Sequence, residues 1–126
     1  MSEPQRPDYK IHLDDKFGKL TKIDIPAEVA ACQDDWFNQT LTTVNDAVVR
    51  LGIIEGEFHW HQHDDDDEFF LVLSGELEID VEGRDTVVLE PHQAFTVPKG
   101  VQHRTRAKQK TVMLMMASAG VVPTGD

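Results

Sequence analysis

Three histidines stand at alternate positions near the middle of the chain: His59, His61 and His63. If this segment is a strand, all three imidazoles lie on one face, because successive side chains of a strand point to opposite sides. Neighbouring imidazoles can chelate one metal ion, with ring nitrogens about 2.0 to 2.1 Å from it. Glu68 opens the next apolar run, and His103 lies on a distant segment that a closed sheet could bring to the same place. The pattern predicts a metal site.

Three imidazoles and a carboxylate leave one or two positions for water or substrate, which is the arrangement that a catalytic metal needs. The ligand types do not select the metal, because imidazole suits zinc, copper, iron and nickel alike. Two alternatives stay open. His61 and His63 could be core histidines satisfied by backbone carbonyls, and His59 could be a rim residue or a contact to the metal ligands or the substrate.

Short β-like runs separated by turn residues begin at Trp36 and must position these side chains. Asn45 and Asp46 predict a hairpin turn between the first two runs, because both residues tolerate the left-handed region. About eight or nine short strands with almost no helix predict an all-β antiparallel sandwich or barrel. The expected strands span residues 37–44, 48–54, 69–73, 76–82, 86–89, 95–97, 101–107 and 111–117.

Two segments that carry the candidate ligands resemble the two sequence motifs of the cupin superfamily. Residues 56–75 contain, in the family's order, a glycine, a His-x-His pair, a glutamate and a second glycine, which are Gly56, His61, His63, Glu68 and Gly75. Residues 92–103 end in the pattern Pro-x-Gly-x-x-His, formed by Pro98, Gly100 and His103. Gly56 stands one residue closer to the His pair than the family pattern asks, His92 replaces an opening glycine, and Ala107 replaces a closing asparagine. None of these departures removes a candidate ligand.

The resemblance implies a cupin-type double-stranded β-helix, or jelly-roll barrel, that holds one divalent metal ion. The implied ligands are His61, His63, Glu68 and His103, and the metal in this family is usually iron, manganese, nickel or zinc. The sequences of the two motifs are most similar to those of small single-domain cupins described as mannose-6-phosphate isomerase-like. We expect an N-terminal arm and short helix over residues 1–35, the barrel over 36–120 and a C-terminal tail over 121–126. The helix is expected at 25–31, because Pro26 is tolerated in a first helical turn.

The inward position of Glu68 predicts which side chains shape a pocket. Phe70 and Val72 share its face of the strand, and Phe95 and His59 are expected to complete the lining. We expect a metal-dependent enzyme that acts on a small polar metabolite by dioxygenation, isomerisation or lyase chemistry, and the sequence does not select among these reactions. The alternative is a non-catalytic sensor module that binds a small molecule or a metal.

Composition and charge disfavour several classes of partner. The 126 residues include 12 Lys and Arg against 23 Asp and Glu, a formal net charge of −11. We therefore expect no nucleic-acid partner and no binding to an anionic membrane, since both need clustered basic residues. The acidic run Asp64 to Asp67 is interpreted as a solvated loop whose charge repels anions and attracts cations. With a single cysteine, Cys32, and no apolar leader, the expected location is the cytoplasm.

Two of the expected strands are apolar on both faces, so their outward side chains need a cover. They are the runs at residues 69–73 and 112–116. We expect a homodimer to bury these outer faces, with a contribution from the N-terminal segment.

Overall fold

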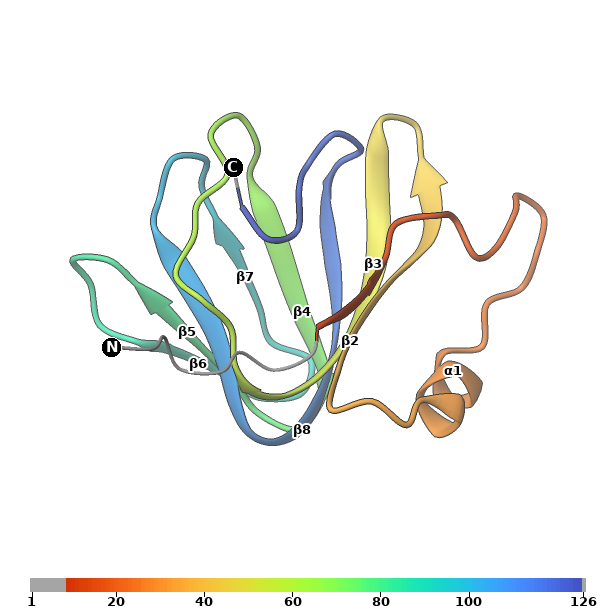
Figure 1. Cartoon of the computed structure of the whole chain (residues 1–126), viewed down its shortest axis with the longest axis horizontal. Coiled ribbons are helices and arrows are strands. Elements are labelled where there is room, and N and C mark those ends of the chain that lie inside the picture. Colours follow the sequence, from red (N-terminus) through yellow and green to blue (C-terminus); the bar gives the residue numbers. More distant parts are fainter. Residues whose placement is uncertain (1–8, 126) are drawn as a thin grey trace, which may run out of the picture.

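One long strand, β8 (His103–Ser118), forms the spine of an eight-stranded sheet that curves into an open barrel (Figure 1). The computed structural model describes residues 9–125. The order across the sheet is β1-β2-β3-β8-β4-β7, with β5 paired to β8 and β6 paired to β5. The other strands are β1 (Lys10–His12), β2 (Trp36–Val44), β3 (Ala47–Glu57), β4 (Glu68–Ser74), β5 (Leu77–Val81), β6 (Val87–Leu89) and β7 (Ala94–Val97). The predicted all-β barrel is confirmed.

The prediction of two separate strands at 101–107 and 111–117 was wrong, because β8 is continuous. Residues 108–110 are polar and exposed, which is typical of a turn, but their backbone stays extended. Along one edge β8 pairs with β3, and along the other it pairs first with β5 and then with β4. The pairing continues past the polar residues, so tertiary hydrogen bonds override the local turn signal.

The N-terminal part contributes one short strand and one short helix. Strand β1, which the sequence did not predict, pairs in parallel with β2. Helix α1 (Ile25–Ala31) spans the expected residues, and the Asp24 side chain caps it by accepting a hydrogen bond from the Ala27 amide at 3.2 Å. Among the described residues, no helix has the length and apolar character needed to cross a membrane.

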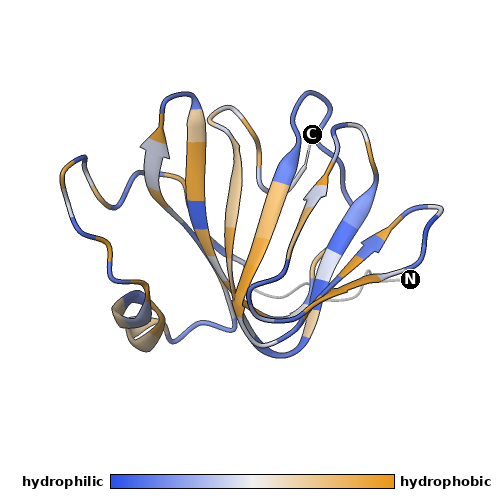
Figure 2. Ribbon diagram, turned by 180° about the vertical axis from the view of Figure 1, so that it is seen from behind, coloured by the Kyte–Doolittle hydropathy of each residue, from blue (hydrophilic) through white to orange (hydrophobic). Residues whose placement is uncertain are grey.

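Alternation along the strands divides the apolar side chains into an inner cluster and an outer one. The inner cluster fills the barrel and includes Ile54, Phe70 and Met115. The outer cluster, centred on Leu51 and Ile53, is packed against side chains of the N-terminal segment. These covering residues are Phe17, Ile23, Ile25, Val29 and Cys32. Figure 2 shows the apolar character concentrated on the central strands and the polar character in the connecting loops. The N-terminal segment thus covers part of the outer face.

Candidate metal centre

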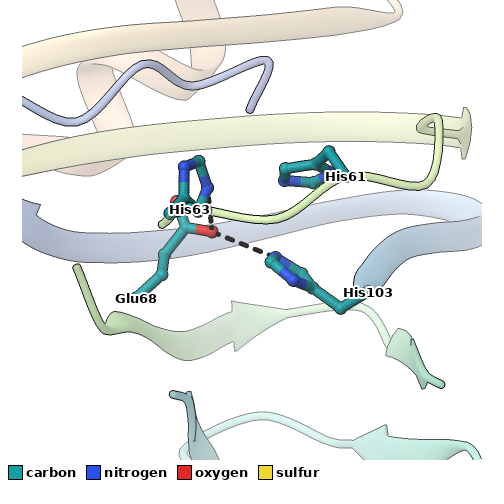
Figure 3. A group of neighbouring side chains, drawn as sticks. All are labelled: His61, His63, Glu68 and His103. Carbon is teal, nitrogen blue, oxygen red and sulfur yellow. Dashed lines mark ion pairs between the residues drawn. The ribbon is translucent and has the colours of Figure 1, made fainter. Parts of the chain in front are cut away.

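The four predicted ligands lie together inside the barrel (Figure 3). One ligand atom from each of His61, His63, Glu68 and His103 lies within 4.8 Å of the others, and all four residues are buried. Glu68 Oε1 is 3.4 Å from His63 Nε2 and 3.5 Å from His103 Nε2. The carboxylate therefore faces imidazole nitrogens that come from two other parts of the chain.

Strand ends and one isolated bridge position these side chains. Glu68 opens β4 and His103 opens β8. The His61 amide donates to the His103 carbonyl at 2.9 Å, and the His103 amide donates to the His61 carbonyl at 2.8 Å. The strand expected across the three alternate histidines is not regular, because β3 ends at Glu57 and His61 makes only this bridge. A two-bond bridge is nevertheless enough to place two ligands opposite each other.

Backbone carbonyls fix the orientation of two imidazoles. His61 Nδ1 lies 3.0 Å from the His59 carbonyl oxygen, and His103 Nδ1 lies 2.9 Å from the Val101 carbonyl oxygen. A carbonyl oxygen only accepts, so each Nδ1 donates to it, and Nε2 is the ring nitrogen that is left to face the cluster. Histidines that ligate metals are oriented by the same kind of outer hydrogen bond.

The charges of the cluster suit a cation. Burial lowers the pKa of His61 to about 4, so this imidazole is neutral at pH 7. Burial opposes ionisation of Glu68, but the imidazoles of His103 and His63 outweigh it and lower the pKa of the carboxyl to about 2. One carboxylate with imidazole nitrogens matches the donor set of zinc, iron and nickel sites. The residues present therefore fit a divalent metal ion.

A narrow cavity adjoins the cluster. Its free volume is about 30 Å³, room for about two water molecules. His61 and Glu68 are the titratable residues in its lining, which otherwise consists mostly of apolar side chains. The apolar lining includes Trp36, Ile54, Phe58, Phe70, Met113, Met115 and Pro123. The size and the apolar walls of this cavity favour a small ligand.

Of the four residues expected to shape the pocket, only one lines this cavity. Phe70 lines the cavity. Val72 is fully buried in the inner cluster, and Phe95 is partly buried against that cluster, so neither lines this cavity. His59 lies at the rim, where its Nε2 is 2.6 Å from the Thr124 carbonyl oxygen.

The last described residues close the barrel near the site, which the sequence did not indicate. In Figure 1 this segment turns back across the open end of the barrel. Pro123 lines the cavity, and Val121 is buried. Gly125 has a φ of +97°, and a Cβ there would be 2.6 Å from the Cβ of His61. A glycine is therefore required at this contact.

Arg50 is a buried charged residue of the barrel that the sequence pattern did not predict as part of a site. It lies in the middle of β3 and is 4% exposed. The available signal was a single charged residue within the apolar run of residues 48–54. Because both faces of that run are apolar, the sequence did not show on which face the charge lies.

Comparisons with known proteins agree with this fold. Residues 47–118 match the family model described as "Cupin domain". An uncharacterized protein of Bacillus subtilis (strain 168), YdbB, is 47% identical over 77 residues, which cover 61% of this chain and 68% of that protein.

Two solved structures are similar to the barrel. A cupin-2 domain containing protein from Shewanella frigidimarina NCIMB 400 is 30% identical with a TM-score of 0.70, covering 75% of this chain and 91% of the other. A cupin superfamily protein from Desulfitobacterium hafniense DCB-2 is 16% identical with a TM-score of 0.65, covering 90% and 98%. The second likeness concerns the fold alone.

Proposed function

This chain belongs to the cupin domain family, and from its buried ligand set we propose that it binds one divalent metal ion and acts as a metal-dependent enzyme on a small polar metabolite. The observation that carries the proposal is the convergence of three imidazoles and one carboxylate beside a small cavity. Iron, manganese, nickel and zinc all suit this donor set.

The ligands would be His61, His63, Glu68 and His103. When bound, a metal ion here supplies a Lewis acid for a substrate oxygen, and iron adds redox chemistry with dioxygen. The chain's own contribution is to orient the imidazoles of His61 and His103 and to place a largely apolar wall beside the ligand cluster. Both titratable residues of the cavity lining belong to the ligand set. This disfavours an isomerase that needs a separate acid and base.

Metal content measured by mass spectrometry on protein without an affinity tag tests the site. We expect about one metal ion per chain in the parent and loss in His61→Ala and His103→Ala. His12→Ala, which removes an exposed histidine of β1, is the matched control and should keep the metal. A parent that stays empty after reconstitution with iron, manganese, nickel and zinc would overturn the proposal.

Turnover separates an enzyme from a sensor. The metal-loaded protein is incubated with sugars, sugar phosphates, thiols and hydroxy acids, with oxygen uptake recorded for the iron form. Consumption of one compound supports the enzyme. A compound that raises the melting temperature without being consumed favours the sensor module.

Burial of the outer face in a homodimer stays a prediction. Met116, on the outer face of β8, is 42% exposed beside Phe69 of β4, so the N-terminal segment does not cover this part. Light scattering at micromolar concentration should give twice the mass of the chain. A monomer would contradict the expected dimer.

A further inference from the structure

Arg50 is a buried cation that faces the barrel interior. In β3 it alternates with Gly52 and Ile54, and Ile54 belongs to the inner cluster. A Cβ on Gly52 would be 2.9 Å from the side chains of Met113 and Met115, which belong to the same cluster. The alternation therefore places the Arg50 side chain on the face that carries the metal-ligand cluster.

The hydrogen bonds of Arg50 are few and long. Its Nε donates to Thr40 Oγ1 at 3.3 Å, and its Nη2 donates to the Val121 carbonyl at 3.5 Å. A guanidinium has five N–H donors and keeps its charge in proteins. Over residues 9–125, no ion pair within 4.0 Å is found for this side chain. A buried charge is normally paired with a group of opposite charge. Within the described residues, the guanidinium of Arg50 has no such partner in contact.

The electrostatics of the interior favour an anionic ligand. Burial lowers the pKa of Arg50, and the charge of Glu68 opposes that shift, so the two groups interact inside the barrel. A divalent metal ion on the cluster would more than neutralise Glu68 and leave the interior positive. Of the aspartates at residues 64–67, Asp64, Asp65 and Asp67 are exposed, so water and salt screen their charges and they oppose this field only weakly.

The C-terminal segment occupies donors that a ligand would use. The Val121 carbonyl accepts from Arg50, and the Thr124 carbonyl accepts from His59. Pro123, between them, lines the cavity beside His61. The Val121 carbonyl is a neutral acceptor at 3.5 Å from Arg50 Nη2. A carboxylate oxygen of a ligand that replaced it would give Arg50 a charged acceptor.

We propose that Arg50 anchors the carboxylate of a small carboxylic acid bound in the barrel interior, which is the substrate class of this protein. The assignment rests on the proposed function, because it places the substrate in the same interior as the metal. A carboxylate fits the planar fork of a guanidinium with two parallel hydrogen bonds.

Calorimetry with defined probes tests the anchor. Glycolate carries the carboxylate, glycolamide is its neutral analogue, and inorganic phosphate is the competing anion. In the zinc-loaded protein, Arg50→Met should lower the affinity for glycolate at least 10-fold and leave that for glycolamide unchanged. Arg50→Lys should give an intermediate loss, because it keeps the charge and loses the fork. Arg84→Met, at an exposed arginine, should match the parent.

Two further readouts separate this proposal from its alternatives. Metal content should be the same in the parent and in Arg50→Met, whereas failure of the metal site itself would appear as an empty parent. The melting temperature of Arg50→Met should equal or exceed that of the parent, since an unpaired buried charge is removed. Unchanged glycolate affinity, a preference for phosphate, or a lower melting temperature with retained glycolate binding would each overturn the assignment.

Discussion

Two polar clusters share strand β8 and differ in how completely their charges are satisfied. The ligand cluster consists of His61, His63, Glu68 and His103, and the ion-pair cluster of Glu78, Asp80, Arg104 and Arg106. His103 and Arg104 are consecutive, so alternation sends one inward and the other outward. One strand thereby carries a site on one face and a structural contact on the other.

The ion-pair cluster is complete without any ligand. Asp80 Oδ2 accepts from Arg104 Nε at 2.8 Å and from Arg106 Nε at 2.7 Å, while Glu78 Oε2 accepts from Arg106 Nη1 at 2.8 Å. The Arg106 guanidinium holds the pKa of Asp80 well below its usual value, with Thr86 and Arg104 adding hydrogen bonds. In the ligand cluster the imidazole Nε2 atoms converge instead on a shared centre. A site is recognised here by the convergence of ligand atoms from separate parts of the chain, not by charge alone.

The largest expected effect comes from removing the inner carboxylate. Glu68→Gln should weaken metal binding by roughly 1,000-fold, since each ligand of a four-ligand site carries a large share of the binding free energy. Asp80→Asn is the matched outer change and should alter metal affinity by less than about twofold. Competition with a chromophoric chelator measures both. Equal losses in the two variants would mean that the clusters are not independent.

Acid should affect the two clusters in different pH ranges. The pKa of His61 is about 4 in the folded chain against 6.5 for an ordinary histidine, so between these values only the unfolded chain binds the proton. The free energy of unfolding of the metal-free protein should therefore fall as the pH drops from 6.5 to 4, by about 2 to 3 kcal/mol. The lowered pKa of Asp80 stabilises the fold above its ordinary value of 3.8, and this contribution is lost only below about pH 4.

Urea titrations at several pH values measure this dependence. In His61→Leu the slope between pH 6.5 and 4 should be smaller than in the parent, because that variant has no imidazole to protonate at this position. A variant with the parent's slope would show that another group is responsible.

A smaller loss of stability is expected in the ion-pair cluster. Asp80→Asn should lower the free energy of unfolding by about 1 to 2 kcal/mol, because Arg104 and Arg106 lose a charged acceptor. Asp85→Asn, at an exposed position, should have no measurable effect. If both variants unfold like the parent, the ion pairs do not contribute to stability.

The smallest effect concerns the edge of the ion-pair cluster. Arg104 Cζ lies 5.3 Å from the centre of the Trp60 ring, and Trp60 is 48% exposed. Trp60→Leu should lower the free energy of unfolding by about 0.5 kcal/mol, since exposed cation–π contacts are weak. The same urea titrations detect this change, and a loss above about 2 kcal/mol would indicate a packing role for the ring.

The sequence predicted the features that depend on residue type and local spacing. The all-β fold, the helix at 25–31 and the turn at Asn45 follow from short-range patterns, and the structure contains each of them. The four candidate ligands could be named because histidine and glutamate at these spacings are chemically distinctive, and the fold brings them together.

The features that the sequence could not show depend on pairing partners. Strand β8 continues through Lys108 because β3 pairs with it on both sides of this position. Arg50 faces inward because of the sheet's register, which a strand apolar on both faces does not reveal. The C-terminal segment has no periodic pattern, and its place follows from contacts such as that of Gly125 with His61.

The position of β8 in the chain has a consequence for folding during synthesis. This strand pairs with β3, β4 and β5, yet every one of them leaves the ribosome earlier. Until residues 103–118 emerge, β3 and β4 expose unpaired edges and apolar faces, which are the surfaces that favour aggregation. The central hydrogen bonds of the barrel join residues far apart in sequence, such as Val48 and Ala117, so the barrel closes slowly and late.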